Sequence, residues 1–453
     1  MNPKSRHAIR TPTQLCVFRK PVTVSETFMR TARYAENPKK YLEKTSDSLV
    51  SSRQGALSSP LLENSMVDMD LYGSGTCKDR FEKTIAHKLG KSHGLFFLTG
   101  TQAQLSALKT HATQQQRSLI GWHPTSHLET SEQESYKYLY NLNRVLVGTN
   151  RNRLASMEEI NDIVSRPVDQ RPAAILLEIP NRTLGCATYS FSELEKISSM
   201  CRTAGVALHC DGARIWEIEA FYNATSGKSF DDIGALFDSV YVSLYKGLGG
   251  ITGAMVLHND KAFIEELKIW QHRAGGRPFT LAYEIADCER GYHEMVNTFS
   301  RKREKMIRVV REISRATATQ HNSHGERIVR FVPEVPTCCQ VLTYFDGFNE
   351  HELLAARDRV EQQLNVRIFE RLRSSFDIID TDSEATKTRL LQHQLDLPKQ
   401  AAVPIGKEYI EWRIGSVTEQ IADDVFVETY VAFCNALKGL VKCRPGDSTI
   451  DSL

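Results

Sequence analysis

Residues that could perform chemistry occur where apolar segments end, and the most distinctive is the aspartate of HCDGARIWE at 209–217. The residues before it read as a buried β-strand, so Asp211 should stand at the carboxyl end of that strand, ahead of a Gly-Ala turn. Ligands bind at this edge in open α/β sheets. A carboxylate placed there could ligate a metal, pair with Arg214 or hold a protonated heterocycle. The motif alone leaves these three roles open.

A lysine stands in a similar place in SVYVSLYKGLGGITGAMVL, where Lys246 ends a strand and enters a turn. The glycines of that turn let the backbone approach a cofactor closely. A lysine held there has a pKa open to tuning for Schiff-base chemistry. Ser243 lies three residues earlier, where its hydroxyl could meet a phosphate. The alternative is an exposed loop lysine, which is the commoner situation for any single lysine.

An anion site is the third candidate, in LTGTQAQ, where a strand runs into Gly100 and Thr101 ahead of a helix. Free backbone amides at a helix N-terminus, together with two hydroxyls, suit one phosphate group. The motif lacks the spacing of a Walker loop or of a GxGxxG fingerprint. An ordinary threonine cap explains the motif equally well.

Alternating strands and helices must position these residues. Repeated units of this kind predict an α/β fold with a large, mostly parallel sheet that is covered on both faces. Helical periodicity occurs in 79–90 and 192–205, and short buried strands are predicted at 94–98, 173–179, 206–211 and 239–245.

A different pattern begins past about residue 280. A long charged helix near 282–316 precedes strand-like RFVPEV, CCQVLTYF and YIEWRI and a last helix from Thr418 to about Leu440, which predicts a compact α+β unit. Length also favours two domains, because single cores rarely grow past roughly 250 to 300 residues. We therefore expect an N-terminal extension at 1–60, a large domain at 61–300 and a small C-terminal domain at 301–453.

The composition of the chain indicates which partners it binds and in which cellular compartment it works. The 57 basic and 55 acidic residues nearly cancel, so we expect a small-molecule partner, with no nucleic acid and no membrane. No apolar run approaches the ~20 residues of a spanning helix. The ten cysteines contain no CxxC pair, and we expect reduced thiols in the cytoplasm and no metal site. A mitochondrial presegment in the arginine-rich N-terminus is the minority alternative.

Taken together in their order, the three motifs give the chain from about Asp70 to Leu257 a resemblance to a known family. It resembles the threonine aldolase and β-eliminating lyase family of fold-type-I enzymes, which use pyridoxal 5′-phosphate (PLP). LHCDGAR, YKGLGG and LTGTQAQ carry the resemblance, with DLYG at 70–73 as a softer match. The resemblance implies an aspartate-aminotransferase-like fold in which Lys246 carries the cofactor as a Schiff base and Asp211 holds its pyridine nitrogen.

The resemblance also implies roles for residues around the cofactor. Arg214 should lie near its phenolic oxygen. Gly100, Thr101 and Ser243 should bind its phosphate.

Three further residues are assigned by the resemblance alone. The family has a histidine followed five residues later by a glutamate, as His127 and Glu132 stand here, and stacks that imidazole on the cofactor ring. EYIEWRIGSVTEQIADDV resembles the segment whose arginine holds the substrate carboxylate, which is Arg413 in this chain. Family sites are built between subunits, which implies a homodimer or homotetramer in which Tyr72 reaches a neighbouring site. His123 competes with His127 for the ring-stacking role.

Two departures affect the substrate side. Tyr245 precedes the lysine where serine is common in the aldolases, and Gly185 and Cys186 stand where the family has paired glycines. The activity implied is cleavage of a threonine-like β-hydroxy-α-amino acid into glycine and an aldehyde, with His127 as the base. An amino-acid racemase and a β-eliminating lyase are alternatives within the PLP class, and an inactive scaffold of the same fold is a third. A nicotinamide-dependent oxidoreductase should show a glycine fingerprint, which is missing.

Overall fold

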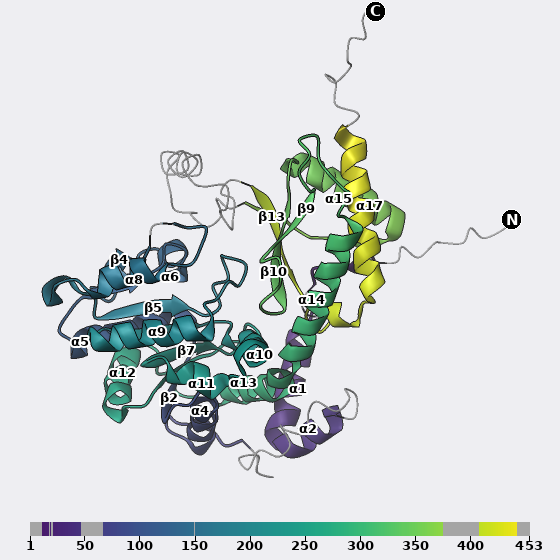
Figure 1. Ribbon diagram of the computed structural model, residues 1–453. Coiled ribbons are helices and arrows are strands. Elements are labelled where there is room, and N and C mark those ends of the chain that lie inside the picture. The colour runs from purple at the N-terminus through teal and green to yellow at the C-terminus, as the bar shows by residue number, and fades with distance from the viewer. Residues whose placement is uncertain are drawn as a thin grey trace, which may run out of the picture.

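A seven-stranded sheet brings the three motifs to one edge (Figure 1). The computed structural model describes residues 11–46 except 18 and 20, residues 67–374 except 149, and residues 407–441. The expected mostly parallel sheet is confirmed, since only β8 runs against its neighbours. The strands in spatial order are β2 (His93–Phe97), β8 (Ala254–His258), β7 (Ser239–Ser243), β6 (Ala207–Gly212), β5 (Ala174–Glu178), β3 (Leu119–Trp122) and β4 (Asn143–Leu146).

Helices cover both faces of this sheet, because successive side chains of a strand point to opposite sides. Along β7, Val240 and Val242 join one apolar core, and Tyr241 joins another on the opposite face. The first core packs against α4 (Thr76–Lys88), α8 (Met157–Val164), α9 (Phe191–Thr203), α10 (Ile215–Ser226) and α11 (Phe230–Ala235). The second face is covered by α5 (Gly100–Gln114) and α12 (Lys261–Arg273), and the short helices α6 (His127–Thr130) and α7 (Ser135–Tyr138) follow β3.

The long helix expected near 282–316 is wrong as a single element. The structure has α13 (Ala282–Met295), a 3-10 turn at Val296–Thr298 and α14 (Phe299–Ala316). The Thr298 hydroxyl donates to the Met295 carbonyl oxygen at 2.7 Å, which tightens the backbone at the junction. The helical periodicity of apolar residues does not reveal this break.

A second, antiparallel sheet stands beside the large one. Its strands in spatial order are β12 (Arg373–Ser374), β13 (Glu408–Arg413), β10 (Gln340–Phe345) and β9 (Val329–Val332), with α15 (Glu350–Leu364) and α17 (Asp423–Val441) packed behind them (Figure 1). The last helix begins at Asp423 and not at Thr418, because the Thr418 hydroxyl accepts from the Gly415 amide and donates to the Arg413 carbonyl oxygen. These bonds hold a 3-10 turn at Thr418–Gln420.

The N-terminal segment crosses both parts of the molecule. β1 (Thr13–Gln14) pairs with β11 (Val366–Arg367), and α1 (Val24–Glu36) and α2 (Pro38–Ser46) pack near α13. The described part of the extension therefore lies on the body of the protein, whereas residues 1–10 and 47–66 lie outside the described residues. The division at residues 60 and 300 stays a prediction. In the described ranges, no helix is both long and apolar enough to cross a membrane.

Candidate active site

A cavity of about 380 Å³ opens at the carboxyl edge of the large sheet, between the ends of its strands and β13. Seven residues singled out from the sequence line it: Gly100, Thr101, His127, Asp211, Arg214, Lys246 and Arg413. Two others do not line it, namely Ser243 and Tyr72. The fold therefore gathers segments that are far apart in the chain around one space, at the edge where parallel sheets bind ligands.

Lys246 extends into this cavity from the turn after β7. The Lys246 amide donates to the Ser243 hydroxyl at 3.4 Å, and the Gly250 amide donates to the Leu244 carbonyl oxygen at 3.0 Å, which closes the turn. Burial lowers the pKa of the Lys246 amine, and the Asp211 carboxylate opposes that shift. A lowered pKa makes the neutral, nucleophilic amine more accessible near neutral pH.

Asp211 is almost completely buried at the end of β6. Its Oδ2 accepts from the Gln104 side-chain amide at 2.9 Å, and its Oδ1 accepts from the Ala213 amide at 3.0 Å. Two donors thus fix the carboxylate in one orientation within the cavity. Gln104 lies one turn of α5 after Gly100, a spacing that could have identified it from the sequence.

Glu178 is a second buried carboxyl group in the cavity, and the sequence analysis missed it. It ends β5 directly beside Asp211 in the strand register, and its Oε1 accepts from the Arg182 amide at 3.0 Å. Burial, followed by the Asp211 charge, raises the pKa of Glu178 to about 7. Its place at the carboxyl end of a predicted strand was the available signal.

The candidate anion site lies at the N-terminus of α5. The Thr99 hydroxyl accepts from the Gln102 amide at 3.3 Å. Thr99 is therefore an N-cap of α5, as the threonine-cap interpretation predicted. Gly100 leaves no space for a side chain, because a Cβ there would clash with the Tyr241 hydroxyl. Thr101 donates its hydroxyl to Glu132 at 3.0 Å. Gly100 and Thr101 both line the cavity, so the N-terminus of α5 presents its backbone to that space.

His127 and Glu132 form an ion pair at the mouth of the cavity. Nδ1 of His127 lies 2.9 Å from Oε1 of Glu132, and the histidine side chain is 49% exposed, whereas the glutamate is buried. This hydrogen bond raises the pKa of His127 against the opposing effect of partial burial. His123 lies outside the cavity, where its ring contacts the Thr125 hydroxyl at 2.8 Å and burial lowers its pKa to about 4.

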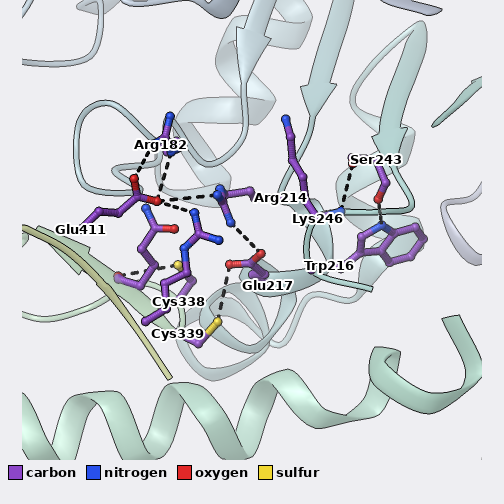
Figure 2. Close-up of polar contacts among 12 residues, drawn as sticks. Arg182, Arg214, Trp216, Glu217, Ser243, Lys246, Cys338, Cys339 and Glu411 are labelled. Atoms are coloured by element: carbon purple, nitrogen blue, oxygen red, sulfur yellow. Dashed lines mark hydrogen bonds and ion pairs between the residues drawn. The ribbon is translucent and has the colours of Figure 1, made fainter. Parts of the chain in front are cut away.

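Three arginine side chains of the described chain line the cavity, and Figure 2 shows two of them, Arg182 and Arg214, around Glu411. Arg214 donates to Glu217 at 3.0 Å, and Glu411 of β13 accepts from both Arg182 and Arg413. Burial opposes ionisation of Glu411, but the neighbouring guanidinium groups outweigh it and lower the pKa. We call Arg182, Glu411 and Arg413 the arginine wall. The sequence analysis missed Arg182 and Glu411, although Glu411 stands two residues before Arg413 in the segment that was singled out for its arginine.

The opposite side of the cavity is built by the large sheet. We call Gly100, Asp211 and Lys246 the sheet wall, since each stands at the carboxyl end of a strand or on the turn that follows it. Ser243 lies beneath this wall, completely buried, with its carbonyl oxygen accepting from the Trp216 indole at 3.1 Å (Figure 2). Its hydroxyl accepts from the Lys246 amide and does not line the cavity, and its expected role at the phosphate stays a prediction.

Two contacts concern residues outside the cavity. Tyr72 is 56% exposed and packs edge-on against Phe279, at 5.3 Å between ring centroids. Arg19, in the N-terminal extension, donates to the carbonyl oxygens of Lys246 and Gly247, the second at 3.0 Å. The sequence analysis did not predict this contact between the extension and the lysine turn.

The architecture is that of fold-type-I PLP enzymes. A protein of Listeria monocytogenes proposed to be an L-allo-threonine aldolase has a similar structure, with a TM-score of 0.70 and 28% identity over 94% of this chain and 96% of that chain. The beta-eliminating lyase family model matches residues 45–331, more than half of the chain. The chain therefore belongs to the beta-eliminating lyase family, as its motifs indicated.

Curated relatives agree with this membership. The low specificity L-threonine aldolase of Saccharomyces cerevisiae is 31% identical over 216 residues, 48% of this chain and 54% of that protein. An alanine racemase of Cochliobolus carbonum is 27% identical over 227 residues, 48% of this chain and 54% of that protein. The chain spans about half the length of these curated relatives.

The donor set of the cavity fits PLP, the cofactor of this family. The sheet wall offers a lysine amine of lowered pKa and a buried carboxylate that is fixed by two donors. The α5 terminus adds its backbone at Gly100 and Thr101, which line the cavity, and Tyr241 leaves no room for a side chain on Gly100. A group with an aldehyde, a protonated ring nitrogen and a phosphate meets a suitable partner for each of these parts.

Proposed function

We propose that this protein is a PLP-dependent aldolase that cleaves the Cα–Cβ bond of a β-hydroxy-α-amino acid to yield glycine and an aldehyde. The observation that carries the proposal is the meeting of Lys246, Asp211, His127 and Arg413 around one cavity. Membership of the beta-eliminating lyase family and likeness to threonine aldolases support this reaction class. The substrate itself is part of the proposal.

The sheet wall would hold the cofactor. Lys246 would bind it covalently through Nζ, Asp211 would keep its ring nitrogen protonated, and Gly100 and Thr101 would bind its phosphate at the α5 terminus. Arg214, held by Glu217, would face its phenolic oxygen. Bound PLP supplies an electron sink for the electron pair released when a bond to Cα breaks.

The remaining residues would act on the substrate. Arg413 presents a guanidinium fork that suits bidentate binding of the α-carboxylate. His127, oriented by Glu132, would take the proton from the β-hydroxyl as the Cα–Cβ bond breaks. Because the Glu132 carboxylate stabilises the protonated imidazole, it favours the state that this step produces.

A direct test uses the PLP-loaded protein with L-threonine, L-allo-threonine, phenylserine and L-alanine. We expect equimolar glycine and aldehyde from at least one hydroxy amino acid, and neither from alanine. A matched control is the Lys246→Ala variant in the same assay. If no β-hydroxy-α-amino acid releases an aldehyde, whether its Cβ substituent is apolar or carries a carboxylate, the aldolase assignment is wrong.

Racemisation is the second candidate, because one relative is an alanine racemase. Glu178 also favours it, since a buried carboxyl group with a pKa of about 7 can exchange a proton near neutral pH. Loss of optical rotation from L-alanine, without release of any aldehyde from the hydroxy amino acids, would favour this reaction. β-Elimination is separated from both by release of an α-keto acid and ammonia.

Assembly into a homodimer or homotetramer stays a prediction, as does the role of Tyr72 at a neighbouring subunit. Its exposed ring is available for such a contact. Sedimentation of the protein, followed by comparison with a Tyr72→Ala variant, measures both.

A further inference from the structure

One buried carboxylate in the arginine wall is surrounded by four guanidinium groups. Glu411 binds Arg182 through both of its oxygens, with Nε of Arg182 at 3.2 Å from Oε1. Arg413 donates to the same Oε1, Arg214 lies 3.8 Å from it, and Arg373 lies 3.5 Å from Oε2. Among the described residues, this is more cationic charge than one carboxylate needs for its own ionisation.

The guanidinium of Arg182, and not the carboxylate, faces the open side of this cluster. The Arg182 side chain is 36% exposed, whereas Glu411 is 8% exposed. Arg182 uses Nε and Nη2 for Glu411, and its Nη1 donates to no residue that the structure describes. In Figure 2, the ends of Arg182 and Lys246 extend to the same side of the cluster. Arg182 therefore offers unused donors to the cavity that it lines.

Glu411 also places the two forks side by side. Arg182 and Arg413 meet the same Oε1 atom, so their guanidinium groups are neighbours although both are cations. The proposed function assigns one fork, Arg413, to the α-carboxylate of the substrate. The second fork then lies close to where the substituent on the adjacent carbon must be.

Most of the side chains that line the cavity carry a polar group. Among the described residues of the lining, only Leu98, Ala213 and Ile251 have purely apolar side chains. The others carry hydroxyl, amide or charged groups, or are glycine. An anionic group on Cβ would therefore find a charged donor here.

We propose that Arg182 is a specificity-determining residue and that the substrate class is a β-hydroxy-α-amino acid with a carboxylate on Cβ, such as 3-hydroxyaspartate. This inference rests on the proposed function and names its substrate. Arg182 binds the second carboxylate through the donors that Glu411 leaves unused. Glu411 acts as a positioning residue, because its carboxylate binds the guanidinium groups of both Arg182 and Arg413.

The reaction balances without a further reactant. The Cα–Cβ bond of 3-hydroxyaspartate breaks, and its electron pair stays with the Cα fragment. The hydroxyl proton passes to the base, the hydroxyl oxygen becomes the aldehyde oxygen of glyoxylate, and Cα takes up one proton to give glycine. Neither an external oxidant nor an external reductant is needed.

The test compares kcat/KM of the holoenzyme for both diastereomers of L-3-hydroxyaspartate with kcat/KM for L-threonine and L-allo-threonine, scored as glycine released. We expect the better dicarboxylate to exceed the better threonine by about 100-fold, because a fork paired with a carboxylate discriminates strongly. Arg182→Gln should remove most of this preference, and Arg182→Lys should keep part of it. Succinate binding to the holoenzyme, measured by calorimetry, should weaken in Arg182→Gln as well.

Arg373→Gln is the matched control. Arg373 binds the same carboxylate but does not line the cavity, so its loss perturbs the ion cluster without removing the second fork. We expect its substrate preference to match that of the unmodified protein. An equal change of preference in Arg373→Gln and Arg182→Gln would show that only the integrity of the cluster matters, and would overturn the assignment.

Failure of the inference is distinguishable from failure of the proposed function. Cleavage of threonine with no preference for 3-hydroxyaspartate overturns the inference and leaves the aldolase intact. Absence of glycine from all four substrates overturns the aldolase and the inference together. If Arg182→Gln does not fold, as judged by circular dichroism, Arg182→Lys and the unmodified preference still decide the question.

Discussion

The two walls of the cavity are assembled in different ways. Each residue of the sheet wall stands in the last residues of its own strand or within three residues after it, so a short local pattern positions it. The arginine wall depends on contacts across the chain, since Arg182 and Glu411 are 229 positions apart. The side of the site that would hold the cofactor is therefore encoded locally, and the side that would select the substrate is encoded by tertiary packing.

The largest effect should come from the sheet wall. Lys246→Ala removes the amine that would bind the cofactor covalently, so we expect the visible absorbance of the bound cofactor to disappear. The turnover number should fall by at least about 10⁴-fold, because the other catalytic groups act only together with this nucleophile. Absorbance and steady-state rates measure the two effects, and circular dichroism checks the fold. A variant that retains both the band and the activity would contradict the assignment.

A smaller effect of a different kind should come from the arginine wall. Arg413→Gln removes one carboxylate-binding fork but leaves the sheet wall intact, so the visible band should remain. We expect KM for the amino acid to rise by about 100-fold, the range for loss of one partner of a desolvated charge pair. Arg373→Gln again serves as the control, since it contacts Glu411 from outside the cavity. Loss of the cofactor from Arg413→Gln would mean that the two walls are not separable.

The third prediction concerns pH and the mouth of the cavity. Glu132 raises the pKa of His127, so the proposed base loses its proton at a higher pH than an ordinary histidine. The rate should rise as pH increases through this raised pKa. Glu132→Gln should move the rising limb of the pH–rate profile to lower pH. The same linkage means that the ion pair stabilises the fold below the ordinary histidine pKa and ceases to do so above the raised one.

The pH dependence of kcat measures this shift. Glu134→Gln is the control, because Glu134 is an exposed neighbour in sequence that forms an ion pair with Lys137. If the rising limb of the kcat–pH profile is unchanged in Glu132→Gln, the role assigned to the His127–Glu132 pair is wrong.

Much of the sheet wall could be predicted because apolar runs mark strands. The runs ending at Asp211 and Lys246 become β6 and β7, and the glycine turn after β7 follows from composition. Glu178 ends β5 in the same manner, but its importance arises from its register beside Asp211, which no single strand reveals. Strand ends were thus predictable, and the identity of neighbouring strands was not.

Two other features escaped the sequence analysis for physical reasons. The helical repeat of apolar residues runs through 282–316, and a local 3-10 turn at Val296–Thr298 does not interrupt it. The pairing of Arg182 with Glu411 depends on where β13 docks, and periodicity carries no information on docking. Both failures concern how elements are placed in space after they form.

Arg19 is an exception to the rule that the sheet wall is encoded locally. It is distant in sequence from Lys246 and yet supports the turn that carries it. Its guanidinium donates to the carbonyl oxygens of Lys246 and Gly247, and burial lowers its pKa only to about 10, so it stays cationic at neutral pH. Arg19→Gln should loosen the turn and weaken cofactor retention by about two- to tenfold, the range for one hydrogen bond. Dialysis followed by absorbance measures retention, with Arg33→Gln as the control from the same segment. Unchanged retention in Arg19→Gln would mean that the turn after β7 is self-sufficient and that the sheet wall is wholly local.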